Sequence, residues 1–244
     1  LEGKNVKTGK NKRDLAEQAL HIEQDVLQDN VGSQDQVMAA HGGLNKVDFL
    51  PGGQITVTPL ALSLDRIRAL ESHMMLFYTG LTRTASNIVD TYIGTLDQKH
   101  RQLTAMTDLV NEGFNVLNSD ADLSEFGKLL HENWLVKREL GEKISNGHVD
   151  EIYAEARDAG AIGGKLSGAG GGGVMKLFVR PGKQRAVRER LSRLVHVPVQ
   201  FEPSGSQIIF FDPEEDHSAA ERVRAMQNIT PFRDLDRGTR EGMV

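Results

Sequence analysis

The part of the sequence that decides the fold is Gly160-Ala161-Ile162-Gly163-Gly164-Lys165-Leu166-Ser167-Gly168-Ala169-Gly170-Gly171-Gly172-Gly173. Glycine occupies eight of these fourteen positions. Because glycine loses more conformational entropy on folding than any other residue, such a density needs a physical reason. Positive φ angles or the close approach of another group would supply one, and successive turned N–H groups form a nest that attracts phosphate. The apolar run from Val174 to Val179 then predicts a buried strand.

Two common glycine motifs fit this segment poorly. The run from Gly168 to Gly173 matches G-x-G-x-x-G, but a dinucleotide-binding loop follows a strand and opens a helix, whereas here a strand follows the glycines. The Walker pattern fails because Leu166, not serine or threonine, follows Gly164-Lys165. A flexible glycine linker stays open as the alternative. It is disfavoured by the strand beyond the glycines and by the lysine and serine among them.

The core of the segment resembles the C-terminal glycine motif of the GHMP kinases, the superfamily of galactokinase, homoserine kinase, mevalonate kinase and phosphomevalonate kinase. The matching residues are Lys165-Leu166-Ser167-Gly168-Ala169-Gly170-Gly171-Gly172-Gly173. The resemblance implies a loop beside the active site, near the nucleotide phosphates. It assigns nucleotide binding to Ser167, Gly168, Ala169, Gly170, Gly171 and Gly172.

Two carboxylates in the first third of the chain are candidate site residues. Residues 12–30 have a helical apolar stripe with Glu23 beside it, and residues 34–41 predict a short helix with Asp35 in its first turn. Taken alone, Glu23 reads as a solvated neighbour of the core and Asp35 as a carboxylate favoured by the helix dipole.

A sharper interpretation comes from the order of Glu23, Gly32, Asp35 and Gln36, which resembles the central segment of the same superfamily. The resemblance implies that Asp35 is the catalytic base, that Glu23 helps to hold Mg²⁺, and that Gly32 and Gln36 contact the substrate. This match is independent of the glycine motif. We therefore expect both carboxylates to converge on the distant glycine loop.

The remaining pattern predicts an α+β sandwich with helices on one face of the sheet. Strands are expected at residues 44–50, 54–60, 73–78, 174–179, 195–202 and 206–211, and helices at 65–72, 85–117, 122–140, 149–159 and 183–194. The resemblance refines this to the remnant of an N-terminal S5-type α+β domain at residues 1–63 and a C-terminal ferredoxin-like α/β sandwich at 64–211. The glycine-rich loop would occupy 163–173, and a charged tail with one helix near 219–226 would occupy 212–244.

Three basic residues are candidates for binding a substrate phosphate. Arg83 lies at a predicted helix start, where it can grip an anion or simply be a surface arginine. Lys137 and Arg138 are either a solvated basic edge or face a phosphate. Nearby, Trp134 is expected to belong to the core.

Several segments resemble the D-glycero-D-manno-heptose 7-phosphate kinase branch, namely residues 31–36, 77–83, 129–138, 144–146 and 163–166. The resemblance implies transfer of the ATP γ-phosphate to the anomeric hydroxyl of the heptose, with ATP and Mg²⁺ as cofactors. The 1,7-bisphosphate product would lead to nucleotide-activated heptose for lipopolysaccharide or an S-layer glycan. A kinase for another sugar, galactokinase-like or fucokinase-like, stays open.

Composition narrows the class of protein. The 244-residue chain carries a net charge of −5, which gives no reason to expect nucleic-acid binding, and it has no cysteine for a disulfide or thiolate site. No apolar run reaches membrane-spanning length, so no membrane partner is expected. A cytoplasmic location is expected, and a homodimer is left open.

One departure from the family pattern bears on activity. The superfamily's main phosphate loop, of the type Pro-x-x-x-Gly-Leu-Gly-Ser-Ser, is not found in the sequence, which begins at Leu1. We expect the chain to be either a fragment of a longer protein or a truncated gene product, with weak or no ATP binding and no turnover. The alternative from another class is a non-catalytic binding or assembly module with a GHMP fold.

Overall fold

The computed structural model describes residues 11–29, 31–81, 93–168, 170–207 and 218–226. The chain divides into two compact units, Leu1–Ser206 and Gln207–Val244. The second unit contains the helix α9 (Ser218–Met226), close to the helix predicted for the tail. The predicted domain boundary after residue 63 lies inside the first unit and stays a prediction.

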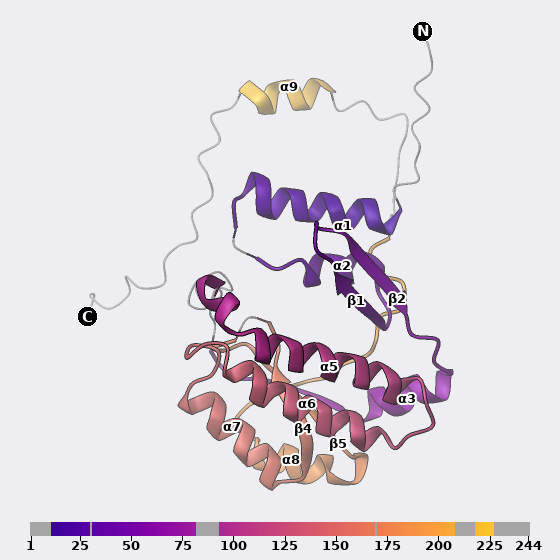
Figure 1. The fold of residues 1–244 in the computed structure, drawn as a ribbon, viewed down its shortest axis with the longest axis vertical. Helices are drawn as coiled ribbons and strands as arrows, with labels where there is room; N and C mark the ends of the chain where they lie inside the picture. Colours follow the sequence, from indigo (N-terminus) through magenta and orange to yellow (C-terminus); the bar gives the residue numbers. More distant parts are fainter. Residues whose placement is uncertain (1–10, 30, 82–92, 169, 208–217, 227–244) are drawn as a thin grey trace, which may run out of the picture. The chain divides into compact units, whose positions relative to one another are not determined.

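The first unit is built on a four-stranded antiparallel sheet (Figure 1). Its strands are β3 (Met74–Tyr78), β4 (Ala161–Leu166), β5 (Val174–Val179) and β6 (Val195–Val197), in the spatial order β4-β5-β3-β6. Helices α5 (His100–Leu117), α6 (Leu123–Arg138) and α7 (Gly147–Asp158) join β3 to β4, and α8 (Gln184–Arg190) joins β5 to β6. This succession and strand order are those of a ferredoxin-like sandwich, so the predicted α+β class is confirmed.

Side chains on both faces of the sheet are buried. Successive residues of a strand point to opposite faces of the sheet. On β5, Leu177 and Val179 lie in one apolar cluster with residues of α7 and α8. Phe178 lies in a second cluster with Leu117 of α5 and Leu123 of α6. The prediction of helices on one face alone is therefore wrong. Trp134 is fully buried in the first cluster, as expected for a core residue.

A smaller layer precedes the sheet in sequence. It consists of α1 (Lys12–Leu20), a π-helix (His21–Val26), α2 (Gln34–His41), the hairpin of β1 (Asn45–Phe49) and β2 (Ile55–Pro59), and α3 (Leu64–Ser72). The buried residues Ala16, Val37 and Ala40 pack there against side chains of the hairpin. This part also confirms the predicted hairpin and the short helix at 34–41.

The prediction of one continuous helix over residues 12–30 is wrong beyond Leu20. From His21 the backbone follows π-helical geometry, and the amide of Leu27 donates to the carbonyl of Ile22 five residues back. Single π-turns are rare and occur often at functional sites. Glu23 lies inside this turn.

The glycine segment is divided differently from the prediction, because residues 161–166 form strand β4 rather than loop. Gly163 and Gly164 are needed there for close packing. A Cβ at Gly163 would collide with the carbonyl oxygen of Gly127 in α6, and one at Gly164 with the carbonyl oxygen of Lys176 in β5. The glycine loop itself is thus confined to residues 167–173.

Three further boundaries differ from the prediction. Strand β6 ends at Val197 because Pro198 offers no backbone donor, whereas residues 195–202 were expected in the strand. Of the expected strand at 206–211, residues 206 and 207 are not in a strand and 208–211 lie outside the described residues. The long helix expected at 85–117 is a 3₁₀-helix (Ile93–Gln98) followed by α5, and residues 82–92 lie outside the described part.

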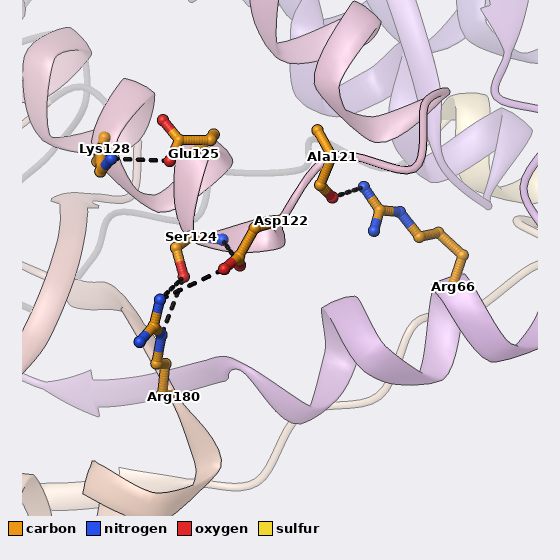
Figure 2. Close-up of polar contacts among 7 residues, drawn as sticks. All are labelled: Arg66, Ala121, Asp122, Ser124, Glu125, Lys128 and Arg180. Carbon is orange, nitrogen blue, oxygen red and sulfur yellow. Dashed lines mark hydrogen bonds and ion pairs between the residues drawn. The ribbon is translucent and has the colours of Figure 1, made fainter.

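The turn between α5 and α6 is held by two arginines (Figure 2). Arg66 of α3 donates to the carbonyl oxygen of Ala121 at 2.8 Å. Arg180, just after β5, donates to the Ser124 hydroxyl at 2.7 Å and pairs with Asp122 at 3.4 Å. Asp122 caps α6 by accepting from the amide of Ser124 at 2.8 Å. These contacts fix the start of α6 against α3 and β5.

Residues 202–206 leave the sheet and contact the end of α2. The amide of Gly43 donates to the carbonyl of Glu202 at 2.7 Å, and the amide of Ser206 donates to that of Ala39 at 2.9 Å. A Cβ at Gly42 would collide with the backbone of Gly205, so only glycine permits this approach. The segment 202–206 therefore ties α2 to the carboxyl-terminal end of the unit.

Candidate active site

The glycine loop is held from two sides. The amide of Gly171 donates to the carbonyl of Ile144 at 2.9 Å, and the Asn146 side chain donates to the carbonyl of Gly171 at 2.9 Å. On the other side, the buried Thr79 donates its hydroxyl to the carbonyl of Gly173 at 2.9 Å. The loop therefore has a fixed shape set by the segments that follow α6 and β3.

Backbone conformation explains why the loop is made of glycine. Gly168, Gly170, Gly171 and Gly173 have φ values of 78°, 127°, 73° and 98°, a region that other residues rarely adopt. The amides of Gly171 and Gly173 are used in internal hydrogen bonds. No group in the described part of the chain accepts from the amides of Gly168, Gly170 or Gly172. A phosphate nest would therefore use these amides, while Ala169 lies outside the described residues.

The structure brings three of the predicted site residues together. Glu23 of the π-helix and Asp35 and Gln36 of α2 line one cavity of about 350 Å³. The Gln36 amide nitrogen donates to the Glu23 carboxylate, while the Gln36 carbonyl oxygen is buried without a partner in the described structure. Gly32 is exposed in the segment leading to α2 and does not line this cavity.

Lys137 connects this carboxylate region to the glycine loop. Its ammonium group donates to the carbonyl oxygen of Gly168 at 2.7 Å. Burial lowers the pKa of Lys137, and the charge of Asp35 acts in the opposite direction. Asp35 thus lies within electrostatic reach of a side chain that is bonded to the loop, although its own carboxylate is exposed to solvent.

Two lysines that the sequence interpretation did not assign belong to the same electrostatic group. Lys165 of β4 and Lys176 of β5 are directly paired across the sheet. Burial, followed by the charges of Lys137 and Lys176, lowers the pKa of Lys165 to about 8. Burial also lowers the pKa of Lys176, and Asp35 opposes that shift. This cross-strand pair could have been predicted from the sequence only if residues 161–166 had been recognised as a strand.

The other predicted phosphate-binding residues have different positions. Arg138 is ion-paired with Asp150 of α7 at 2.9 Å, and the Ser145 hydroxyl donates to the same carboxylate at 2.6 Å. Arg138 therefore ties α6 to α7, and its role toward a substrate stays a prediction. Arg83 lies outside the described residues.

The donor set of the carboxylate region suits a hard cation. Within the described ranges, no group of three or more histidine, aspartate or glutamate side chains is arranged to hold a metal ion. Mg²⁺ commonly takes only one or two protein carboxylates and completes its octahedron with water and phosphate oxygens. Glu23 and Asp35 fit that smaller requirement.

Among the helices that the structure describes, none has the length and apolar character needed to cross a membrane.

Comparison with known proteins gives one family match. Residues 115–196 match the family model described as GHMP kinases C terminal. The D-glycero-alpha-D-manno-heptose 7-phosphate kinase of Campylobacter jejuni is 33% identical over 173 residues, which is 70% of this chain and 51% of that protein. The bifunctional fucokinase/GDP-fucose pyrophosphorylase of Arabidopsis thaliana is 29% identical over 66% of this chain and 16% of its own length.

A solved structure shares the fold. The D-glycero-D-manno-heptose 1-phosphate kinase from Bacteroides thetaiotaomicron superposes with a TM-score of 0.61 at 25% identity, covering 80% of this chain and 54% of that one. The chain thus spans about half the length of the heptose-phosphate kinases that it resembles.

Proposed function

We propose that the chain is part of an ATP-dependent sugar kinase, because residues 115–196 match the family model described as GHMP kinases C terminal. The observation that carries the proposal is the link from Asp35 through Lys137 to the glycine loop. Asp35 acts electrostatically on the Lys137 ammonium group, and Lys137 is hydrogen-bonded to Gly168. A carboxylate and a phosphate-binding loop at one site are what phosphoryl transfer to a hydroxyl requires.

In the proposed reaction, Asp35 accepts the proton of the acceptor hydroxyl while that oxygen attacks the γ-phosphorus of ATP. The bond from this phosphorus to the bridging oxygen breaks, and ADP leaves. The amides of Gly168, Gly170 and Gly172 donate to the phosphate oxygens, and the Lys137 ammonium group offsets negative charge beside them. Ser167 and Ala169 complete the proposed nucleotide loop.

Glu23 is the proposed protein ligand of Mg²⁺. Its carboxylate shares a cavity with Asp35 and is oriented by Gln36. When bound, the ion would offset charge on the phosphate oxygens. Gln36 thereby acts by positioning Glu23.

The acceptor that we propose is D-glycero-D-manno-heptose 7-phosphate, with the anomeric hydroxyl as the attacking group and the 1,7-bisphosphate as the product. Two relatives whose names specify a heptose phosphate support this choice, one by sequence and one by structure. Their names place the phosphate at different positions, C7 and C1. A fucokinase also matches the chain, so L-fucose is the second candidate acceptor.

The test is a coupled assay of ADP release on the 244-residue chain and on the complete gene product. The substrates are heptose 7-phosphate, heptose 1-phosphate, L-fucose and galactose, and ³¹P NMR identifies the product. In the complete protein, Asp35→Asn should lower kcat by a factor of about 10² to 10⁴ because the base is lost. Asp65→Asn is the matched control, since Asp65 also lies in the first turn of a helix.

Equal activity in the Asp35→Asn and Asp65→Asn variants would refute the role of Asp35, because a favourable interaction with the helix dipole alone would then explain its position. Absence of phosphoryl transfer to every sugar by the complete protein, with binding of the same sugars intact, would favour the non-catalytic binding module.

A further inference from the structure

Lys165 and Lys176 are unusual among the half-buried lysines of this fold. Within the described ranges, neither side chain has a hydrogen bond or an ion pair. Lys46 is paired with Asp48 at 3.1 Å, and Lys137 donates to the carbonyl oxygen of Gly168 at 2.7 Å. Withdrawing an ammonium group from water without a partner is costly, so such a group is a candidate for ligand binding.

Strand pairing places the two lysines side by side in one cavity. They are opposite each other on β4 and β5, as Gly163 and Phe178 are two pairs further along. Both lysines line a cavity of about 340 Å³. The cavity is enclosed mainly by apolar side chains of the hairpin segment, α5, α6 and the chain after β6, including Leu44, Leu60, Phe114, Leu130 and Phe201.

A third polar group lies in the same cavity. The side-chain oxygen of Asn133, on α6, is buried and has no hydrogen-bond partner in the described structure. A buried unsatisfied acceptor costs free energy unless a ligand supplies a donor. The cavity thus offers two cations for an anion, one acceptor for a hydroxyl, and apolar walls for carbon-bound hydrogens.

We propose that Lys165 and Lys176 bind the phosphate monoester of the acceptor sugar, and that Asn133 accepts a hydrogen bond from one of its hydroxyl groups. The identity of the acceptor rests on the function proposed above. The phosphate bound here is the one that does not react, since no described residue of the glycine loop lines this cavity, and neither does Asp35 or Glu23. Two ammonium groups match the charge of a phosphate dianion.

The neighbouring charges fit this assignment. The charge of Lys137, on α6, adds to the positive potential at Lys165. The negative charge of Asp35, on α2, partly offsets the charges of Lys137 and Lys176. Lys46 lines the same cavity from β1, but Asp48 offsets its charge. An anion entering between Lys165 and Lys176 would supply the direct ion-pair partner that no described residue gives them.

The experiment measures binding by calorimetry without ATP, using the 244-residue chain and the complete gene product. The probes are heptose 7-phosphate, unphosphorylated heptose, inorganic phosphate and ATP. We expect heptose 7-phosphate to bind more tightly than either inorganic phosphate or the free sugar. Lys165→Gln and Lys176→Gln should each weaken that binding by about tenfold or more, since each removes a charge-assisted hydrogen bond. Lys128→Gln, the control from an exposed ion pair outside the cavity, should change it less than about twofold.

A second arm needs no variant and decides the matter if the glutamine variants do not fold. Affinity of the wild-type chain should fall about tenfold between about pH 7.5 and about pH 9.5, as Lys165 loses its proton. Unchanged affinity over this range would overturn the proposal, as would equal losses in all three glutamine variants. Competition by ATP for the same site would assign the lysines to the nucleotide instead.

The outcomes separate this inference from the kinase proposal. Lysine-dependent binding of heptose 7-phosphate without any phosphoryl transfer would refute the kinase proposal alone. Phosphoryl transfer that is indifferent to Lys165 and Lys176 would refute the phosphate site alone.

Discussion

Replacing Lys165 with methionine should stabilise the protein. Methionine keeps the unbranched apolar stem and removes the ammonium group, whose burial and like-charged neighbours lower its pKa to about 8. A shift of that size from the ordinary value of about 10.4 corresponds to about 3 kcal/mol of unfavourable free energy in the folded state at neutral pH. We therefore expect Lys165→Met to increase the free energy of unfolding at about pH 7 by up to about 3 kcal/mol.

The sign of the pH dependence follows from proton binding. Between the folded and unfolded pKa values, the unfolded chain binds more protons than the folded chain at this residue, so wild-type stability rises with pH. The penalty is full below about pH 8 and is relieved as pH approaches about 10.4. By about pH 9.5, about 2 kcal/mol of it should be recovered, and the advantage of the methionine variant should shrink by that amount.

The assay is urea unfolding of wild type and variant, followed by circular dichroism at both pH values. Lys128→Met is the control, because Lys128 is exposed and its pairing with Glu125 is a surface contact worth little. A Lys165→Met variant that is less stable than wild type at neutral pH, or whose advantage does not change with pH, would refute the claim that this lysine is held at a cost to stability.

Two other substitutions test the packing that positions the site. Gly163→Ala should destabilise the fold by about 1–3 kcal/mol, because its methyl group would meet the Gly127 carbonyl of α6; thermal unfolding should show no comparable loss for Gly182→Ala, where a Cβ meets nothing within 4 Å. Arg66→Met should cost about 1–3 kcal/mol, because the carbonyl of Ala121 loses its donor. Arg68→Met, an exposed neighbour on the same helix, is the control, and equal midpoints for the two arginine variants would contradict the role of Arg66.

The sequence predicted the fold class well because its strongest signals are local. The apolar run of β5 and the glycine pair in the β1–β2 turn each specify an element from neighbouring residues alone. Strand β4 was missed because its glycines exist for contacts with α6 and β5, which are distant in sequence. Hydrophobic periodicity does not identify a glycine whose role is to leave space for backbone atoms that are distant in sequence.

The candidate site was predicted in part for the same reason. Glu23, Asp35 and Gln36 line one cavity, and the roles that their motif assigns to them stay predictions. The cross-strand pair of Lys165 and Lys176 depends on the register of β4 with β5, and the ion pair of Arg138 depends on α7. Charge alone therefore favoured Arg138 as a phosphate ligand and overlooked Lys165.

The attachment of residues 202–206 to α2 has a consequence for biosynthesis. The helix that carries Asp35 and the Gly43 that follows it emerge from the ribosome early, but their backbone partners Ser206 and Glu202 are translated about 160 residues later. Until the intervening sheet has been synthesised, α2 lacks its contacts with residues 202–206. Premature termination just before residue 202 would leave every described strand in place and still remove the backbone contacts that tie this helix to the end of the unit.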